Sequence, residues 1–156
     1  MENGGREIRM FDFKFNWSPQ IETGITEIDD QHKVLFRIGR DIEQLLQYRC
    51  IGVSEKQLLD IICELRDYTA YHYYEEEALM EQAGYPKLEE QRATHRKFAE
   101  YVENIDCPAM RDNPERELKK VRDALQDMIF NHMMVDDQEM AKAIKPVLEN
   151  QKVAET

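Results

Sequence analysis

The four histidines of the chain are the residues whose type and spacing point most directly to chemistry. They are His32, His72, His95 and His132. Apolar side chains lie three, four or seven residues from each of them, which places each histidine on the apolar face of a helix. A buried polar group without a partner costs roughly 1 to 3 kcal/mol. Four inward histidines therefore favour a shared partner, and a metal ion is the obvious one.

Carboxylates share two of these faces. Glu76 lies four residues after His72, one helical turn further along the same face. Asp136 and Asp137 lie four and five residues after His132, so spacing alone leaves both as candidates. A buried carboxylate is costly unless it is paired or bound to a metal. Imidazoles and carboxylates inside a helix bundle suit a pair of iron ions, although such sites also take manganese or zinc.

Three neighbours of these candidates are expected to have other roles. Glu75 and Glu77 flank Glu76 and fall on other faces of the helix, where we expect them to stay in water. Tyr68 lies one turn before His72 on the same face. It is either a core residue, or a hydrogen-bond donor or redox-active group beside the metals.

Four predicted helices position the histidines, one on each helix. Apolar residues at helical spacing, together with start and stop signals, place these helices at residues 29–49, 54–83, 86–105 and 113–145. Ser54 and Gln57 form a capping-box pattern, and Gly84 is a stop signal for the second helix. Pro146 bends or ends the fourth helix, after which we expect a short C-terminal helix. The pattern predicts an all-α, up-down-up-down four-helix bundle.

The first residues of the chain lack a helical period. The segment "FDFKFNW" alternates apolar and polar residues, which predicts an extended arm anchored by Phe11, Phe13, Phe15 and Trp17. We expect this arm to cover residues 1–25 and to act as a lid on the bundle. The bundle should then occupy residues 26–149, and a tail should follow at 150–156.

Composition excludes several classes of function. The 156 residues suffice for one domain with a sizeable core. A net charge of −11 argues against binding to nucleic acid or to an anionic membrane surface, and it favours a monomer. Cys50, Cys63 and Cys107 have no metal-like spacing, which indicates reduced thiols. Without a leader or a membrane-spanning run, the chain is expected to be cytoplasmic.

Four segments, in this order and spacing, resemble the bacterial hemerythrins over most of the chain. They are "WSPQIETGITEIDDQH" at 17–32, "HYYEEEALM" at 72–80, "HRKF" at 95–98 and "HMMVDD" at 132–137. The first contains the family's Asp-x-Gln-His motif. The second is similar to His-Phe-x-x-Glu-Glu-x-x-Met, with Tyr73 in place of phenylalanine. The third is similar to His-x-x-Phe, and the last to His-Ile-x-x-x-Asp, which selects Asp137 over Asp136.

The resemblance implies a non-heme diiron centre that binds O2. The implied terminal iron ligands are His32, His72, His95 and His132, and the implied bridging carboxylates are Glu76 and Asp137. An oxo or hydroxo group would complete the bridge. In the family, O2 binds at the iron that has fewer histidines. The implied function is storage, delivery, scavenging or sensing of O2; a metal-free bundle with core histidines is the remaining alternative.

The sequence departs from the family pattern at two positions. The family has a fifth histidine four residues before the one that matches His95, and here that residue is Gln91. An amide oxygen is a much poorer iron ligand than imidazole. Gln91 therefore binds weakly, contacts a metal-bound water, leaves the position open, or is a surface residue. An open position favours a diiron enzyme that reduces O2, peroxide or NO with an unidentified electron donor. The second departure is Met128, where the family often has tryptophan.

Overall fold

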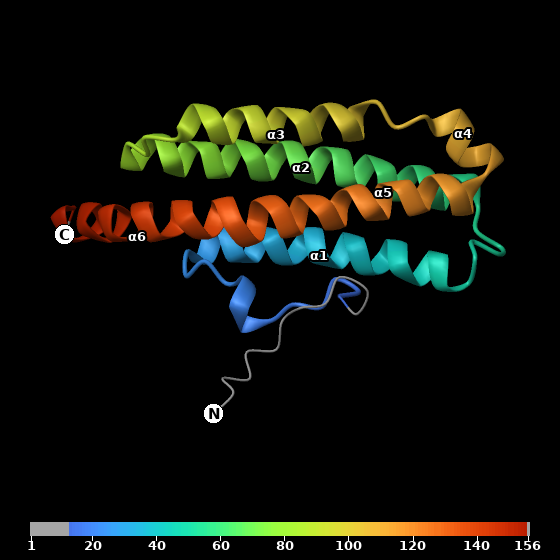
Figure 1. Cartoon of the computed structure of the whole chain (residues 1–156), viewed down its shortest axis with the longest axis horizontal. Helices are drawn as coiled ribbons and strands as arrows, with labels where there is room; N and C mark the ends of the chain where they lie inside the picture. Colours follow the sequence, from blue (N-terminus) through green and yellow to red (C-terminus); the bar gives the residue numbers. More distant parts are fainter. Residues whose placement is uncertain (1–12, 156) are drawn as a thin grey trace.

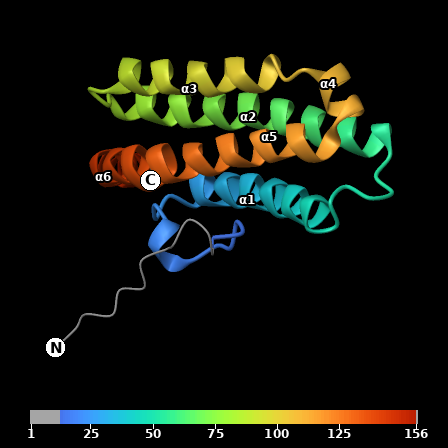
Figure 2. The same ribbon diagram turned by 45° about the vertical axis from the view of Figure 1, so that its right-hand side comes forward.

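The computed structural model describes residues 13–155, and all regular elements in this part of the chain are helical. They are η2 (Pro19–Ile21), α1 (Thr26–Gln47), α2 (Glu55–Ala83), α3 (Leu88–Glu103), α4 (Cys107–Asp112), α5 (Pro114–Met128), η3 (Ile129–Asp136) and α6 (Asp137–Ala154). Elements α5, η3 and α6 join into one long rod, which lies beside α1, α2 and α3 (Figures 1 and 2). The chain passes up and down through these four rods in sequence order, so the predicted all-α four-helix bundle is confirmed.

The ends of α2 are built from the predicted signals. The Ser54 hydroxyl accepts a hydrogen bond from the Gln57 backbone N–H at 3.1 Å, and the Gln57 side chain accepts one from the Ser54 N–H at 2.8 Å. Gly84 follows the last turn with φ of 68°, a left-handed conformation that glycine adopts without steric cost. The capping box therefore starts the helix that carries His72 and Glu76, and glycine ends it.

Other boundaries differ from the prediction. Helix α1 begins at Thr26, earlier than the predicted residue 29, and α3 begins at Leu88, after Pro86. The predicted connection between the third and fourth helices contains α4, which is capped by the Asp106 side chain bonded to the Ala109 N–H. With six residues, α4 is too short to show a helical period in the sequence.

The expected separate helix at the C-terminus is wrong, because α6 continues through Pro146 to Ala154 (Figure 1). Proline removes one backbone donor from a helix interior. Packing on both sides offsets this cost: Ile144 and Leu148 are buried in a cluster with Ile28 and Met80. The rod is therefore held against α1 and α2 across the proline.

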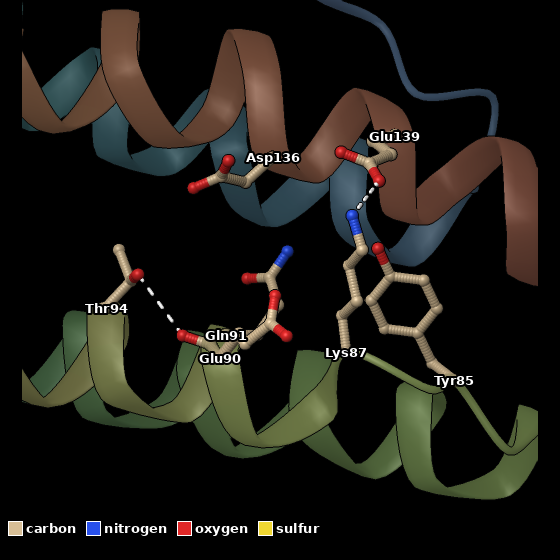
Figure 3. A pocket seen from close by; sticks show the side chains of 7 residues that line it. All are labelled: Tyr85, Lys87, Glu90, Gln91, Thr94, Asp136 and Glu139. Carbon is tan, nitrogen blue, oxygen red and sulfur yellow. Dashed lines mark hydrogen bonds and ion pairs between the residues drawn. The ribbon is translucent and has the colours of Figure 1, made fainter.

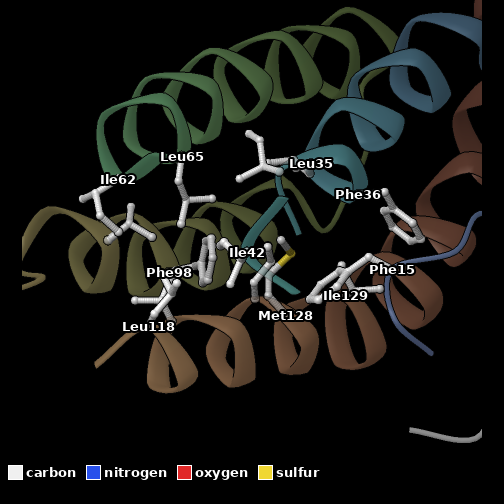
Figure 4. Packing of buried hydrophobic residues seen from close by; sticks show 14 of the residues in the cluster. Phe15, Leu35, Phe36, Ile42, Ile62, Leu65, Phe98, Leu118, Met128 and Ile129 are labelled. Atoms are coloured by element: carbon white, nitrogen blue, oxygen red, sulfur yellow. The ribbon is translucent and has the colours of Figure 1, made fainter. Parts of the chain in front are cut away.

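The described part of the N-terminal arm packs against the bundle. Phe11 lies outside the described residues, but Phe13 and Phe15 are buried in the main core. The Phe15 ring, seen among the core side chains in Figure 4, lies against Gly39 of α1, where an added Cβ would overlap the ring. Trp17 is partly buried, and its ring meets the Phe36 ring edge-on with a distance of 5.0 Å between the ring centroids. Glycine in α1 thus provides the space for the arm.

The structure also bears on the cysteines and on membrane-spanning helices. All three cysteines are free thiols, with only Cys50 buried. Within residues 13–155, no helix has the length and apolar character needed to cross a membrane.

Candidate metal centre

The six predicted ligands meet in the interior of the bundle. Helix α1 supplies His32, α2 supplies His72 and Glu76, α3 supplies His95, and the last rod supplies His132 and Asp137. None of these residues is more than 2% exposed. They form two clusters that share the two carboxylates, and within each cluster the potential ligand atoms lie within 4.8 Å of one another. His32 and His72 belong to the first cluster, and His95 and His132 to the second.

Each carboxylate directs one oxygen to each cluster. On the first side, His32 Nε2 lies 3.5 Å from Glu76 Oε2 and 3.2 Å from Asp137 Oδ2, and His72 Nε2 lies 3.2 Å from Glu76 Oε2. On the second side, His95 Nε2 lies 3.1 Å from Glu76 Oε1, and His132 Nε2 lies 3.2 Å from Asp137 Oδ1. This is the arrangement that two carboxylates bridging a pair of cations require.

A π-helical segment directs Asp137 into the interior. His132 lies within η3, and the Asp137 backbone N–H donates to the His132 carbonyl, a hydrogen bond that spans five residues. Such wide turns are rare and often occur at functional sites. Asp136 instead places Oδ2 at 3.0 Å from His132 Nδ1, on the outer side of the imidazole.

Three of the four imidazoles are held from behind by a second side chain. His72 Nδ1 lies 2.8 Å from Gln31 Oε1, and His95 Nδ1 lies 2.8 Å from Glu77 Oε2. His132 Nδ1 lies 3.0 Å from Asp136 Oδ2. Because these oxygens accept, each imidazole donates its Nδ1–H and directs Nε2 to the shared carboxylates. Metal-binding histidines are usually oriented in this way.

The expectation that Glu77 stays in water is wrong. Its side chain is only 24% exposed and contacts both His95 and Arg92, the latter at 3.2 Å. Sequence reasoning sought ligands on inward faces. It therefore missed Gln31 and Glu77, and it considered Asp136 only as a possible ligand and not as a partner of His132 Nδ1. Each of the three is adjacent in sequence to a predicted ligand, which is the signal that could have found it.

Two tyrosines of α2 differ in their relation to the centre. The Tyr73 ring stacks on His95 with a centroid distance of 3.8 Å and an interplanar angle of 6°. Burial raises the pKa of its phenol well above the ordinary value. Tyr68 packs at the edge of the core, where its ring lies 5.6 Å from Tyr71. Gln31, rather than Tyr68, is bonded to His72 Nδ1.

The buried imidazoles and carboxylates of the centre shift one another's pKa values. Burial alone would lower the pKa of His32 and of His95, but the neighbouring carboxylates outweigh burial and raise both to about 9. Burial lowers the pKa of His72. Burial would raise the pKa of Glu76, but the surrounding imidazoles, His72 first, hold it well below its ordinary value. Positive charge on two imidazoles therefore compensates the buried carboxylates when no cation does.

Unpartnered polar atoms indicate that the residues fit a cation. Buried side-chain nitrogens and oxygens nearly always have a hydrogen-bond partner in folded proteins. Here, the buried atoms without one include His32 Nδ1 and Nε2, His72 Nε2, Glu76 Oε2, Gln91 Oε1 and Asp137 Oδ2. Apart from His32 Nδ1 and Gln91 Oε1, they are the potential ligand atoms of the two clusters. Metal ions at the centre would satisfy them.

Gln91 is a buried neighbour of the second cluster and not a surface residue. It is 5% exposed. Its Nε2 donates to Asp137 Oδ1 at 3.4 Å, while its Oε1 has no partner among the described residues. The second cluster therefore has an amide beside it in place of a third imidazole.

A helix bundle with paired histidine clusters and shared carboxylates defines a class of metal-binding four-helix bundles. Comparison of the sequence with known families places the chain within this class. Residues 23–144 match the family described as Hemerythrin HHE cation binding domain. Because the match covers most of the chain, the protein belongs to the hemerythrin family.

Several relatives of the chain carry the name Bacteriohemerythrin. The protein from Clostridium acetobutylicum is 29% identical over 125 residues, which are 80% of this chain and 97% of the relative. That from Stenotrophomonas maltophilia is 31% identical over 132 residues, or 83% and 80% of the two chains. That from Campylobacter jejuni is 33% identical over 116 residues, or 74% and 84%. The matches thus cover at least 80% of each of these three relatives.

Proposed function

We propose that the protein binds O2 at a non-heme diiron centre. In this proposal, His32 and His72 hold one iron, His95 and His132 hold the other, and Glu76 and Asp137 bridge the pair. The observation that carries the proposal is the division of each carboxylate between the two histidine clusters. Family membership and the names of the relatives support iron and O2 as the metal and ligand.

The iron pair supplies the electrons and coordination positions that O2 binding needs. The protein contributes orientation and exclusion of water. Gln31, Glu77 and Asp136 hold three imidazoles with Nε2 inward. Burial of all the ligands separates the centre from bulk solvent. This separation helps to retain bound O2, as storage, delivery, scavenging or sensing of O2 requires.

A second candidate function is a diiron redox enzyme that reduces O2, peroxide or NO. Gln91 favours it, because its carboxamide lies beside the second cluster where a further imidazole would complete coordination. Each iron would then have two histidines and room for an exogenous ligand. Turnover requires an external electron donor, so consumption of reductant separates this function from O2 carriage.

Anaerobic loading with Fe(II), metal counting and admission of O2 test both functions. A carrier should hold about two irons and develop a lasting visible absorption band that disappears when O2 is removed. A redox enzyme should show a short-lived band, rapid conversion to the diferric form and consumption of added reductant. His32→Ala and His132→Ala should lose iron and stability under both functions. Absence of bound iron in the unmodified protein would refute the proposal and support a metal-free bundle.

We also infer that the protein is a cytoplasmic monomer without nucleic-acid or membrane partners. The net charge of −11 and the three free thiols support this inference. Light scattering at several protein concentrations would test the oligomeric state.

A further inference from the structure

A polar pocket opens between α3 and the long rod formed by α5, η3 and α6. Its volume is about 190 Å³. The residues that line it, shown in Figure 3, are Tyr85, Lys87, Glu90, Gln91, Thr94, Asp136 and Glu139. They come from α3, η3, α6 and the connection between α2 and α3, and none comes from α1. The pocket therefore lies away from His32, on the side of the second histidine cluster.

Two lining residues also contact the candidate metal centre. Gln91 Nε2 lies 3.4 Å from Asp137 Oδ1, and Asp136 Oδ2 lies 3.0 Å from His132 Nδ1. A molecule in the pocket is thus separated from the second cluster by the side chain of Gln91. The family pattern has histidine at this position, so the pocket and the departure from the pattern coincide.

The carboxamide of Gln91 offers the pocket an unsatisfied hydrogen-bond acceptor. Figure 3 shows this side chain extending from α3 toward the space between the helices. Its Oε1 is buried and has no partner among the described residues. An unsatisfied buried acceptor costs about 1 to 3 kcal/mol, so the position favours a ligand that donates a hydrogen bond.

The charges of the lining select against anions. Glu90, Asp136 and Glu139 contribute three carboxylates, whereas Lys87 contributes one ammonium, which is paired with Glu139 at 2.6 Å. The remaining negative charge repels anionic ligands. Polar walls and a small volume suit a small uncharged molecule that forms hydrogen bonds.

We propose that this pocket is the entry and binding site for a small uncharged hydroxylic ligand, water or hydrogen peroxide, at the iron held by His95 and His132. The ligand would donate a hydrogen bond to Gln91 Oε1 and would lie where the family pattern has an imidazole side chain. The proposal rests on the proposed diiron function and gives its second iron a separate polar access route.

A structure of the metal-free protein tests the binding site without reference to iron. A crystal structure at a resolution that shows ordered water should place a water molecule in the pocket, within hydrogen-bond distance of Gln91 Oε1. A pocket without water there, or an Oε1 atom bonded to another protein group, would overturn the proposal. This outcome does not depend on metal binding, so it is separate from failure of the diiron proposal.

Blocking the pocket tests its use as an access route. In Thr94→Phe, and in Thr94→Leu as a second variant, an apolar side chain fills the pocket, whereas Thr94→Ser keeps the hydroxyl and adds no bulk. Iron counts and unfolding curves first establish that each variant folds and loads. The anaerobic diferrous proteins are then mixed with hydrogen peroxide, which accepts two electrons and two protons and leaves as two water molecules.

Oxidation by peroxide should slow at least tenfold in the filled variants and remain within twofold in Thr94→Ser. Oxygenation by O2 should stay within twofold in all three variants. Unchanged peroxide rates in the filled variants, or equal slowing with O2, would overturn the proposal. Failure of the unmodified protein to bind iron would instead overturn the diiron function and leave the crystallographic test standing.

Azide tests the selection against anions. Glu90→Lys reverses one charge of the lining and should accelerate azide binding to the diferric protein about tenfold, since the repulsion is reduced. The peroxide rate should rise much less than the azide rate, because peroxide carries no charge. Equal effects of this substitution on both ligands would contradict the uncharged class of ligand.

Discussion

Asp137 and His132 are five residues apart, yet Asp137 Oδ1 lies 3.2 Å from His132 Nε2. In an α-helix, residues five apart lie on different faces because each residue turns the helix by about 100°. The π-helical turn of η3 removes this difference, and the Asp137 N–H bonds the His132 carbonyl across it. Local backbone geometry thus decides which of two adjacent aspartates faces the candidate metal centre.

The adjacent aspartates should therefore differ in their effect on metal binding. Asp137→Ala removes the carboxylate that both clusters share, and we expect loss of stoichiometric metal. Asp136→Ala removes only the group behind His132, and we expect metal affinity to fall about 10- to 100-fold. Competition with a chromophoric chelator measures both. Equal losses in the two variants would contradict the assignment of Asp137 as the bridging residue.

Glu77 should act through His95. Glu77→Ala removes the acceptor of the His95 Nδ1–H, so the imidazole loses its orientation, and we expect about 10- to 100-fold weaker metal binding with a retained fold. Glu75→Ala is the matched control, because Glu75 precedes Glu76 in the same helix and belongs to neither cluster. Far-UV circular dichroism checks the fold, and chelator competition measures affinity. Indistinguishable affinities of the two variants would count against this role.

The metal-free protein should lose stability in alkaline solution. The pKa of His32 and of His95 is about 9 in the folded protein, compared with the ordinary value of 6.5 that applies to the unfolded chain. The folded form therefore binds these protons more tightly. This contribution is fully present below pH 6.5 and is lost as the pH rises through 9. Urea unfolding of the metal-free protein should therefore give a smaller free energy of unfolding at pH 10 than at pH 7.

The metal-loaded protein is the control for this pH dependence. Cations replace the protons on His32 and His95, so the decrease between pH 7 and pH 10 should be smaller than in the metal-free protein. Metal uptake at pH 7 should also release about two protons, which an indicator dye in weak buffer can count. A stability that rises toward pH 10 in the metal-free protein would contradict the raised pKa values.

The contact between Phe15 and Gly39 should determine how the arm is anchored. Gly39→Ala puts a methyl group into the Phe15 ring, and we expect a loss of about 1 to 3 kcal/mol in the free energy of unfolding. In the background of Phe15→Ala, the same substitution should cost much less, because the ring is gone. Denaturant unfolding of the two single variants and the double variant measures the coupling. Strict additivity would show that the two side chains do not interact.

Regular features of the chain were predictable from sequence, and their physical basis explains why. The periodic apolar residues, the Ser54 cap and the Gly84 stop are local signals, so the bundle and the ends of α2 could be predicted. The inward faces of the histidines follow from the same period. Three features were not predictable in this way. Helix α4 has only six residues, too few to show a helical period. The continuity of α6 through Pro146 and the π turn of η3 depend on tertiary packing, which a helical period does not encode.

The residues that meet in the candidate centre could be predicted from the sequence, but the side chains that orient their imidazoles could not. Helical spacing brings Glu76 to the face of His72, but spacing alone left Asp136 and Asp137 open until the family motif was considered. The contacts from Gln31 to His72 and from Glu77 to His95 join different helices. Such contacts depend on how the helices rotate against each other, which one helix's pattern does not contain.

In the proposed diiron centre, the sharing of Glu76 and Asp137 would make the two cation positions interdependent. A protein that held only one cation would leave one buried oxygen of each carboxylate, and two imidazoles, without their metal. Each cation also fixes the two carboxylates in the orientation that its neighbour needs. The centre is therefore expected to fill and empty as a pair, so that a limited supply of metal yields a mixture of full and empty molecules rather than a population of half-loaded ones.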